Sequence, residues 1–211
     1  MISMMKIEWM ASQPDRSGRY SLRFADGTTM RLYKQTIQDF GLFVGKELEE
    51  QEYQRLTEAV SVMSARMRAV RIVSASSVSA KDLEQRLIQK GEDPQYALQA
   101  VQWMESLNLL DDRRTAEQIV RKCAAKGYGI ARAKQALYEK RVAKEYWDEA
   151  LADYPDQTDA IIAFLRSRLP EKWERKDLQR VTNALVQRGH SYSDVRKALQ
   201  SISIEEETWE E

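Results

Sequence analysis

The chain of 211 residues has one cysteine, Cys123, and one histidine, His190. A single cysteine excludes an intrachain disulfide, and the two residues together fall short of the roughly four ligands of a usual zinc site. The sequence has no Gly-x-x-x-x-Gly-Lys-Ser/Thr loop and no Gly-x-Gly-x-x-Gly turn, which mark nucleotide pockets. No acid, base and nucleophile converge in it either, so we expect no enzyme, no cofactor and no metal.

Long apolar runs are also missing. No run approaches the roughly 20 residues that span a bilayer, and residues 1–20 lack the apolar core of a signal peptide. With only eight glycines and four prolines, the composition is typical of a helix-rich folded protein. We therefore expect a cytoplasmic protein that makes no membrane contact.

Residues 1–46 show the alternation of short strands. In RYSLRF, Tyr20, Leu22 and Phe24 fall on one side, and TMRLY alternates again after Asp26-Gly27, a dipeptide that suits a tight hairpin. The segment KIEW could add a strand, and FGLFVG at 40–45 is either another short strand or the turn into the first helix. This part of the chain predicts a small β-rich module.

From residue 47 onward the apolar period changes to that of a helix. Leu56, Val60, Met63, Met67 and Val70 form one stripe, which we interpret as core packing. Further along, Ser79 followed by Asp82, and Asp93 followed by Pro94, are typical helix starts.

A repeat runs through this helical part. Residues 87–101, 137–151 and 185–199 align without gaps, at spacings of 50 and 48 residues. Gly91 and Gly189 suit the left-handed position after a helix end, and Arg141 takes that place in the second copy at some strain. Each copy has a further helix upstream, roughly at 48–74, 113–126 and 158–169, so each repeat comprises three helices.

The fold predicted from these patterns is mainly α, with tandem three-helix repeats forming an elongated curved array after a small β-rich N-terminal module. We place the boundaries at 1–46 for the module, 47–110, 111–155 and 156–203 for the repeats, and 204–211 for an acidic tail.

The formal net charge of zero hides an uneven distribution. Residues 113–144 contain ten bases and two acids, Glu117 and Glu139, whereas a solvated helix face usually mixes both signs. Two helices should present these bases outward, since Ala116, Ile119, Val120 and Cys123 in one, and Ile130, Ala133 and Leu137 in the other, form the inward stripes. The predicted residues for binding a partner or nucleic acid are Arg113, Arg114, Arg121, Lys122, Lys126, Arg132, Lys134, Tyr138, Lys140, Arg141 and Lys144.

The charge alone leaves the partner open. Phosphates of a nucleic acid need only Lys and Arg and no sequence motif, and an acidic protein groove would serve as well. We expect the acidic tail EEETWEE, residues 205–211, to be disordered. The alternative is that it competes with DNA for the basic repeat.

Residues 108–129, NLLDDRRTAEQIVRKCAAKGYG, with the Lys-Gly and Arg-Gly steps of the repeats, resemble the RecX family of bacterial regulatory proteins. The resemblance covers about residues 60–203. It rests on Leu109 to Asp112, Ala116, Gly127 and Gly129. Two departures stand out: Ser77-Val78 precede Ser79 where the family often has an Arg and another bulky residue, and Arg141 replaces a common Gly.

The resemblance implies a binding protein that lodges in the groove of the RecA filament on single-stranded DNA. Such a protein limits ATP hydrolysis and strand exchange by RecA. The implied partners are the RecA filament and the single-stranded DNA within or beside it, and we expect the chain to be a monomer. The alternative function is a helical regulator that binds duplex DNA independently of RecA, although no separate recognition helix stands out.

Other conspicuous residues have structural interpretations. We expect Cys123 to be a buried small hydrophobe, Asp111-Asp112 to start a helix, and His190 to be exposed after a helix-ending glycine. We expect Trp103, Trp147 and Trp173 to pack in cores.

Overall fold

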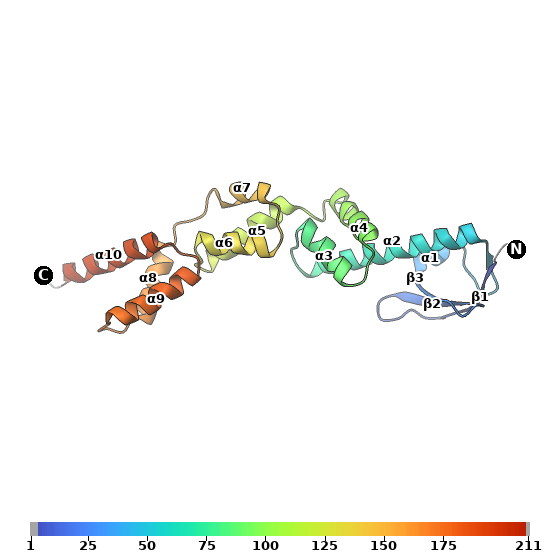
Figure 1. The fold of residues 1–211 in the computed structure, drawn as a ribbon, viewed down its shortest axis with the longest axis horizontal. Coiled ribbons are helices and arrows are strands. Elements are labelled where there is room, and N and C mark those ends of the chain that lie inside the picture. Colours follow the sequence, from blue (N-terminus) through green and yellow to red (C-terminus); the bar gives the residue numbers. More distant parts are fainter. Residues whose placement is uncertain (1–3, 210–211) are drawn as a thin grey trace. The chain divides into compact units, whose positions relative to one another are not determined.

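A computed structural model describes the backbone of residues 4–209 and the side chains of residues 4–202. Helices dominate it, and a small antiparallel sheet lies near the N-terminus (Figure 1), so the predicted mainly α class with a β-rich start is confirmed. The elements are β1 Met5–Met10, β2 Arg19–Phe24, β3 Thr29–Tyr33, α1 Lys34–Asp39, β4 Glu47–Leu48, α2 Glu50–Ala75, α3 Ala80–Gln89, α4 Pro94–Ser106, α5 Asp112–Ala125, α6 Ile130–Glu139, the 3₁₀ turn η1 Lys144–Tyr146, α7 Trp147–Leu151, α8 Thr158–Arg168, α9 Arg175–Gln187 and α10 Tyr192–Trp209.

Backbone contacts divide the chain into two compact units. The first comprises Met1–Ser77 and Leu83–Leu110, and the second comprises Val78–Asp82 and Asp111–Glu211. The first turn of α3 therefore belongs to the second unit, a division that the repeat pattern did not predict.

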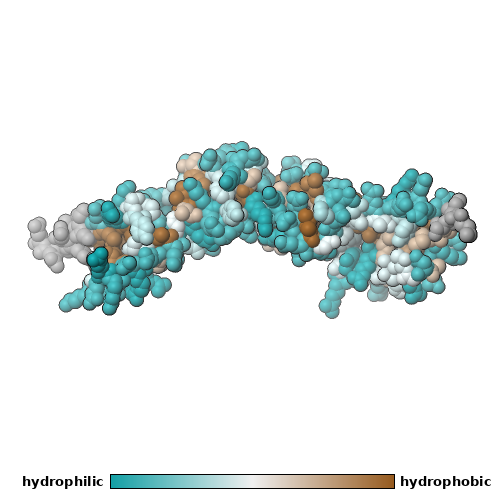
Figure 2. Space-filling model, in the orientation of Figure 1, coloured by the Kyte–Doolittle hydropathy of each residue, from teal (hydrophilic) through white to brown (hydrophobic). Residues whose placement is uncertain are grey.

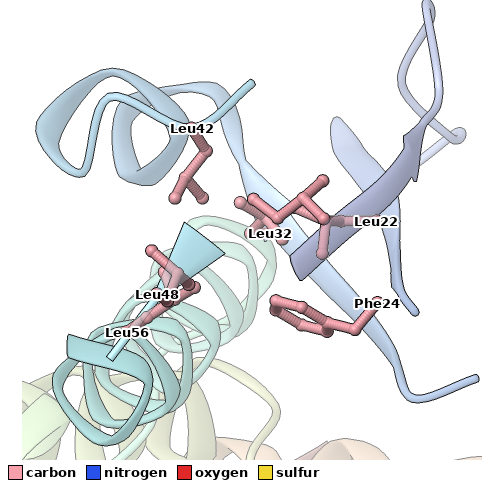
Figure 3. Packing of buried hydrophobic residues seen from close by; sticks show 7 residues of the cluster. Leu22, Phe24, Leu32, Leu42, Leu48 and Leu56 are labelled. Carbon is pink, nitrogen blue, oxygen red and sulfur yellow. The ribbon is translucent and has the colours of Figure 1, made fainter. Parts of the chain in front are cut away.

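The N-terminal sheet has the strand order β3-β2-β1-β4. Gly27 closes the β2–β3 hairpin at a φ of 89°, in the left-handed region that the Asp-Gly dipeptide predicted. Leucines and a phenylalanine from the sheet point toward leucines from the loop after α1, from β4 and from α2, and together they form one core (Figure 3). Its labelled members are Leu22, Phe24, Leu32, Leu42, Leu48 and Leu56.

Two elements of this module were not predicted. Helix α1 has only six residues, too few to show a helical period, and β4 has only two. The segment 40–45 forms the turn region between α1 and β4, so it is not a strand, and it leads into β4 and not directly into a helix.

Helix α2 packs against β3 and β4 of the sheet and against α4. Leu56 is fully buried as predicted, but Met63 and Met67 are only partly buried. Ala65, Ala69 and Ile72 face the core instead. The predicted stripe is therefore displaced in the second half of α2, where two alanines permit a close approach of the helices.

The helices follow one another in three groups of three, as the repeat pattern predicted, although the compact units do not coincide with the repeats. Helices α2, α3 and α4 form the first, α5, α6 and α7 the second, and α8, α9 and α10 the third. The second and third each have their own apolar cluster, one around Ala116 and Leu137 and one around Leu165 and Leu185. Both predicted helix starts are present: the Ser79 Oγ accepts the Asp82 N–H at 3.1 Å, and the Asp93 carboxylate accepts the Gln95 N–H at 2.9 Å.

Candidate functional site

The second helix of every repeat is followed by a residue whose backbone carbonyl is bound by another element. The residue after that carbonyl has a positive φ in all three repeats: 90° at Gly91, 52° at Arg141 and 91° at Gly189. The three hydrogen bonds are Arg68 Nη1 to Lys90 O at 3.0 Å, Ser79 Oγ to Lys140 O at 2.7 Å, and Gly129 N to Arg188 O at 3.0 Å. This carbonyl is thus a recurrent docking point, and the helix start of one repeat uses it in two cases.

The contact between the second and third repeats depends on glycine. A Cβ added to Gly129 would lie 2.0 Å from the Gly189 oxygen, so the α6 start and the α9 end touch through bare backbone. Arg188 lies over the rings of Tyr128 and Phe164, at 4.9 and 5.1 Å from their centroids.

His190 is part of this contact, which corrects the expectation that it is exposed. Only 5% of its surface is accessible, and its Nε2 lies 3.0 Å from the Gly127 oxygen. Burial lowers the pKa of His190, as does the positive charge of Arg188. The sequence hid this role because the groups that surround the imidazole come from the preceding repeat, about 60 residues away.

The segment Val78–Asp82 docks on the start of α5 and the end of α6 through polar contacts instead. The Ala80 N–H donates to the Asp112 carboxylate at 2.7 Å, and desolvation raises the pKa of that carboxyl. Arg141 forms an ion pair at 3.0 Å with Asp82, whose side chain is 5% exposed. This contact explains why an arginine replaces the glycine of the other repeats, although its φ lies in the left-handed region.

Four of the predicted basic residues are ion-paired. Arg113 contacts Glu149, Arg121 lies 3.6 Å from Glu117, and Arg132 lies 3.0 Å from Glu139. Arg141 is the fourth. Each has a carboxylate of the second compact unit beside it, so these four residues contribute less positive potential than the sequence count implies.

The other basic residues have no carboxylate within 4 Å among the side chains that the structure describes. They come from α5, α6 and the turns that follow these helices. We call them the basic face: Arg114, Lys122, Lys126, Lys134, Lys140 and Lys144. Tyr138, the predicted aromatic among them, is 67% exposed. The visible side of the molecule is mostly hydrophilic, with small apolar patches (Figure 2).

A cavity of about 780 Å³ opens beside the basic face within the second unit. The start of α3 and the end of α6 line it, together with residues around η1 and α7. Its lining residues are Ala80, Lys81, Asp112, Tyr138, Glu139, Arg141, Val142, Ala143, Lys144 and Trp147.

The remaining structural expectations are confirmed in part. Cys123 is buried, and desolvation raises its pKa. Asp111 caps α5 by accepting the Arg114 N–H. Trp103 and Trp147 are half-buried, the first under Arg66 at 5.0 Å.

Two expectations were wrong, because Trp173 and Ile130 are 47% and 44% exposed. Trp173 lies in the loop before α9, and Ile130 opens α6.

The side chains of the acidic tail lie outside the described residues. No group of His, Cys, Asp or Glu that could hold a metal ion occurs among the described residues, and no described helix is long and apolar enough to cross a membrane.

These features define a protein of tandem three-helix repeats whose second repeat carries a basic face. The family model for RecX, second three-helix domain, matches residues 111–151 of this chain. The regulatory protein RecX of Streptococcus sanguinis (strain SK36) is 26% identical over 192 residues, which cover 89% of this chain and 74% of that protein. The regulatory protein RecX of Clostridioides difficile (strain 630) is 24% identical over 208 residues, covering 93% and 94%.

Solved structures agree on the fold. A crystal structure of regulatory protein RecX matches with a TM-score of 0.65 at 21% identity, covering 93% of this chain and 99% of that one. The crystal structure of RecX from Lactobacillus salivarius matches with a TM-score of 0.61 at 19% identity, covering 69% and 99%. The resemblance to the RecX family is confirmed, and the matches support placing the chain in that family.

Proposed function

We propose that this protein binds RecA filaments on single-stranded DNA and lowers their ATP hydrolysis, using the basic face of its second repeat. The relatives are named regulatory proteins, and the resemblance to their family implies RecA as the target. The observation that carries the proposal is the set of six cations without a nearby carboxylate, on the repeat that the family model matches.

Physical chemistry favours this use of the basic face. Like charges that lie close together repel one another. An anionic surface that approaches the basic face relieves this repulsion, and the free energy of the system falls. A DNA backbone releases condensed counterions when Lys and Arg contact its phosphates, which adds affinity without sequence preference. A regulator that must act along any DNA sequence needs contacts of this kind.

The test is RecA ATP hydrolysis on single-stranded DNA with increasing amounts of the purified protein. The proposal expects inhibition at or below one protein per RecA subunit, and weaker inhibition as salt increases. Specific retardation of one duplex sequence, with RecA activity unaffected, would support the duplex-binding alternative instead.

A further inference from the structure

The cavity at the end of α6 combines an aromatic wall with cations. Tyr138 is largely exposed at this cavity, and Trp147 forms another part of the wall. The Trp147 Nε1–H donates to the Val142 oxygen at 3.0 Å, which fixes the indole ring. A flat apolar ligand would therefore meet a preset surface, and about 780 Å³ is within the usual range for small-ligand sites.

The cations around the cavity are more available to a ligand than the carboxylates are. Lys81 and Lys144 have no carboxylate within 4 Å among the described side chains. Of the two acids in the lining, Glu139 is bound by Arg132 at 3.0 Å, and Asp112 accepts the Ala80 N–H. Phosphate or another acidic group would be repelled by these carboxylates, so we expect it to remain with the two lysines.

This distribution fits one ligand chemistry best. A nucleotide of single-stranded DNA has a flat base for the aromatic wall and a phosphate on each side for the lysines. The Asp112 carboxylate could also accept a hydrogen bond from the exocyclic amino group of a cytosine, adenine or guanine. An acidic peptide with an aromatic side chain would also supply a ring, negative charge and N–H donors, so it is the competing occupant in the test below.

We propose that the cavity between α3, α6 and α7 holds one unstacked base of single-stranded DNA against Tyr138 and Trp147, with its phosphates at Lys81 and Lys144. This site deepens the proposed function, because it specifies which part of the nucleoprotein filament the second repeat contacts. It adds Lys81 and Trp147, which the charge pattern alone did not single out, to the interacting residues.

The experiment measures fluorescence anisotropy of a short labelled single-stranded oligonucleotide with the full chain and no RecA. A second oligonucleotide of the same length has abasic sugars in place of nucleosides, so it keeps the phosphates but lacks the bases. The test variant is Tyr138→Ala. Its matched control is Tyr192→Ala, which removes a tyrosine of similar exposure, 62%, from α10. Circular dichroism establishes that both variants fold.

We expect Tyr138→Ala to raise the dissociation constant for the normal strand roughly tenfold, because stacking on one aromatic ring is worth that much. Tyr192→Ala should bind as the parent does, and the abasic strand should bind the parent at least as weakly as the normal strand binds Tyr138→Ala, because it also lacks the contacts with Trp147 and Asp112. Equal affinities of the parent for the two strands, or equal effects of the two substitutions, would overturn the proposal.

The outcome separates this site from the proposed function. If Tyr138→Ala binds DNA normally but loses inhibition of RecA, the cavity takes a protein side chain and the nucleobase assignment is wrong. If the parent protein inhibits RecA while both strands bind alike, the regulatory function stands and the base site is also wrong. If the parent protein does not inhibit RecA but binds the normal strand more tightly than the abasic strand, the proposed function is wrong and the base site stands.

Discussion

Arg141 occupies a left-handed backbone position that glycine holds in the other two repeats. Such a conformation costs a non-glycine residue about 1–2 kcal/mol. The ion pair with the nearly buried carboxylate of Asp82 offsets this cost, because an opposite charge stabilises an acid that has lost most of its water. Arg141 therefore stabilises the docking of Val78–Asp82, and it is less available to a partner than the sequence pattern predicted.

We predict that Arg141→Glu lowers the free energy of unfolding by about 2 kcal/mol or more, since it places a second carboxylate beside Asp82. The control is Arg114→Glu, an exposed site with no carboxylate within 4 Å in the described part of the chain, where the change should stay within about 0.5 kcal/mol. Urea denaturation of the two variants measures both values. Equal stabilities would show that the ion pair contributes nothing.

His190 makes the contact between the second and third repeats sensitive to pH. Its buried imidazole stays neutral in the folded protein at pH values where the unfolded chain, with a pKa of about 6.5, already binds a proton. The contribution of the neutral His190 to the free energy of unfolding is therefore fully present above about pH 7. It is lost as the pH decreases through 6.5 toward the lower pKa of the folded protein. The hydrogen bond with the Gly127 oxygen opposes this lowering of the pKa, Arg188 adds to it, and Asp194 opposes it.

Replacing His190 by Gln removes the titrating group but keeps an N–H donor for the Gly127 oxygen. We predict that the parent loses more unfolding free energy than His190→Gln between about pH 7 and pH 5.5, by up to about 1.4 kcal/mol per pH unit. Parallel stability curves for the two proteins would contradict a buried neutral imidazole.

At the scale of the element, local sequence signals predicted most helix boundaries within one or two residues. Ser79, Asp93 and Asp111 cap helices because their side chains act on the next turn, which lies close in sequence. The expectations for His190, Ile130 and Trp173 were wrong because their burial depends on distant elements. Helix α1 and strand β4 are too short for a periodic signal.

The docking of α6 on α9 depends on a glycine with an ordinary helix-entry conformation. Gly129 has a φ of −74°, so an alanine there suffers no backbone strain, but its Cβ would overlap the Gly189 carbonyl. We predict that Gly129→Ala costs about 3 kcal/mol of unfolding free energy, at the upper end for overpacking.

The matched control for this substitution is Gly91→Ala. At Gly91 φ is 90° and nothing lies within 4 Å of an added Cβ, so only the backbone strain of about 1–2 kcal/mol applies. Thermal unfolding monitored by circular dichroism compares the two variants. If Gly91→Ala is the more damaging, the direct glycine contact does not hold the two repeats together.

At the scale of the molecule, the repeat organisation was visible in the sequence because each repeat builds its core from residues close in sequence. The excess of bases over residues 113–144 was visible too. Which cations are balanced by acids was not, because the Arg113–Glu149 and Arg141–Asp82 pairs join residues 36 and 59 positions apart. The structure thus reduces the eleven predicted residues to a smaller basic face with one exposed tyrosine.

The measurement that tests the central claim most directly is inhibition of RecA ATP hydrolysis by a charge-reversed basic face. The variant replaces Arg114, Lys122 and Lys134 by Glu and leaves Arg141 intact to preserve the fold. The control replaces three exposed bases of the first unit, Arg31, Lys34 and Arg55, by Glu. Circular dichroism confirms that each protein is folded.

We predict that the basic-face variant needs roughly tenfold more protein or more for half-inhibition, with a flatter dependence on salt, because each lost phosphate contact lowers the slope by about one unit. The control should inhibit as the parent does. Full inhibition by the folded basic-face variant, at the parent's concentration and with the parent's salt dependence, would contradict the claim that this face contacts the filament.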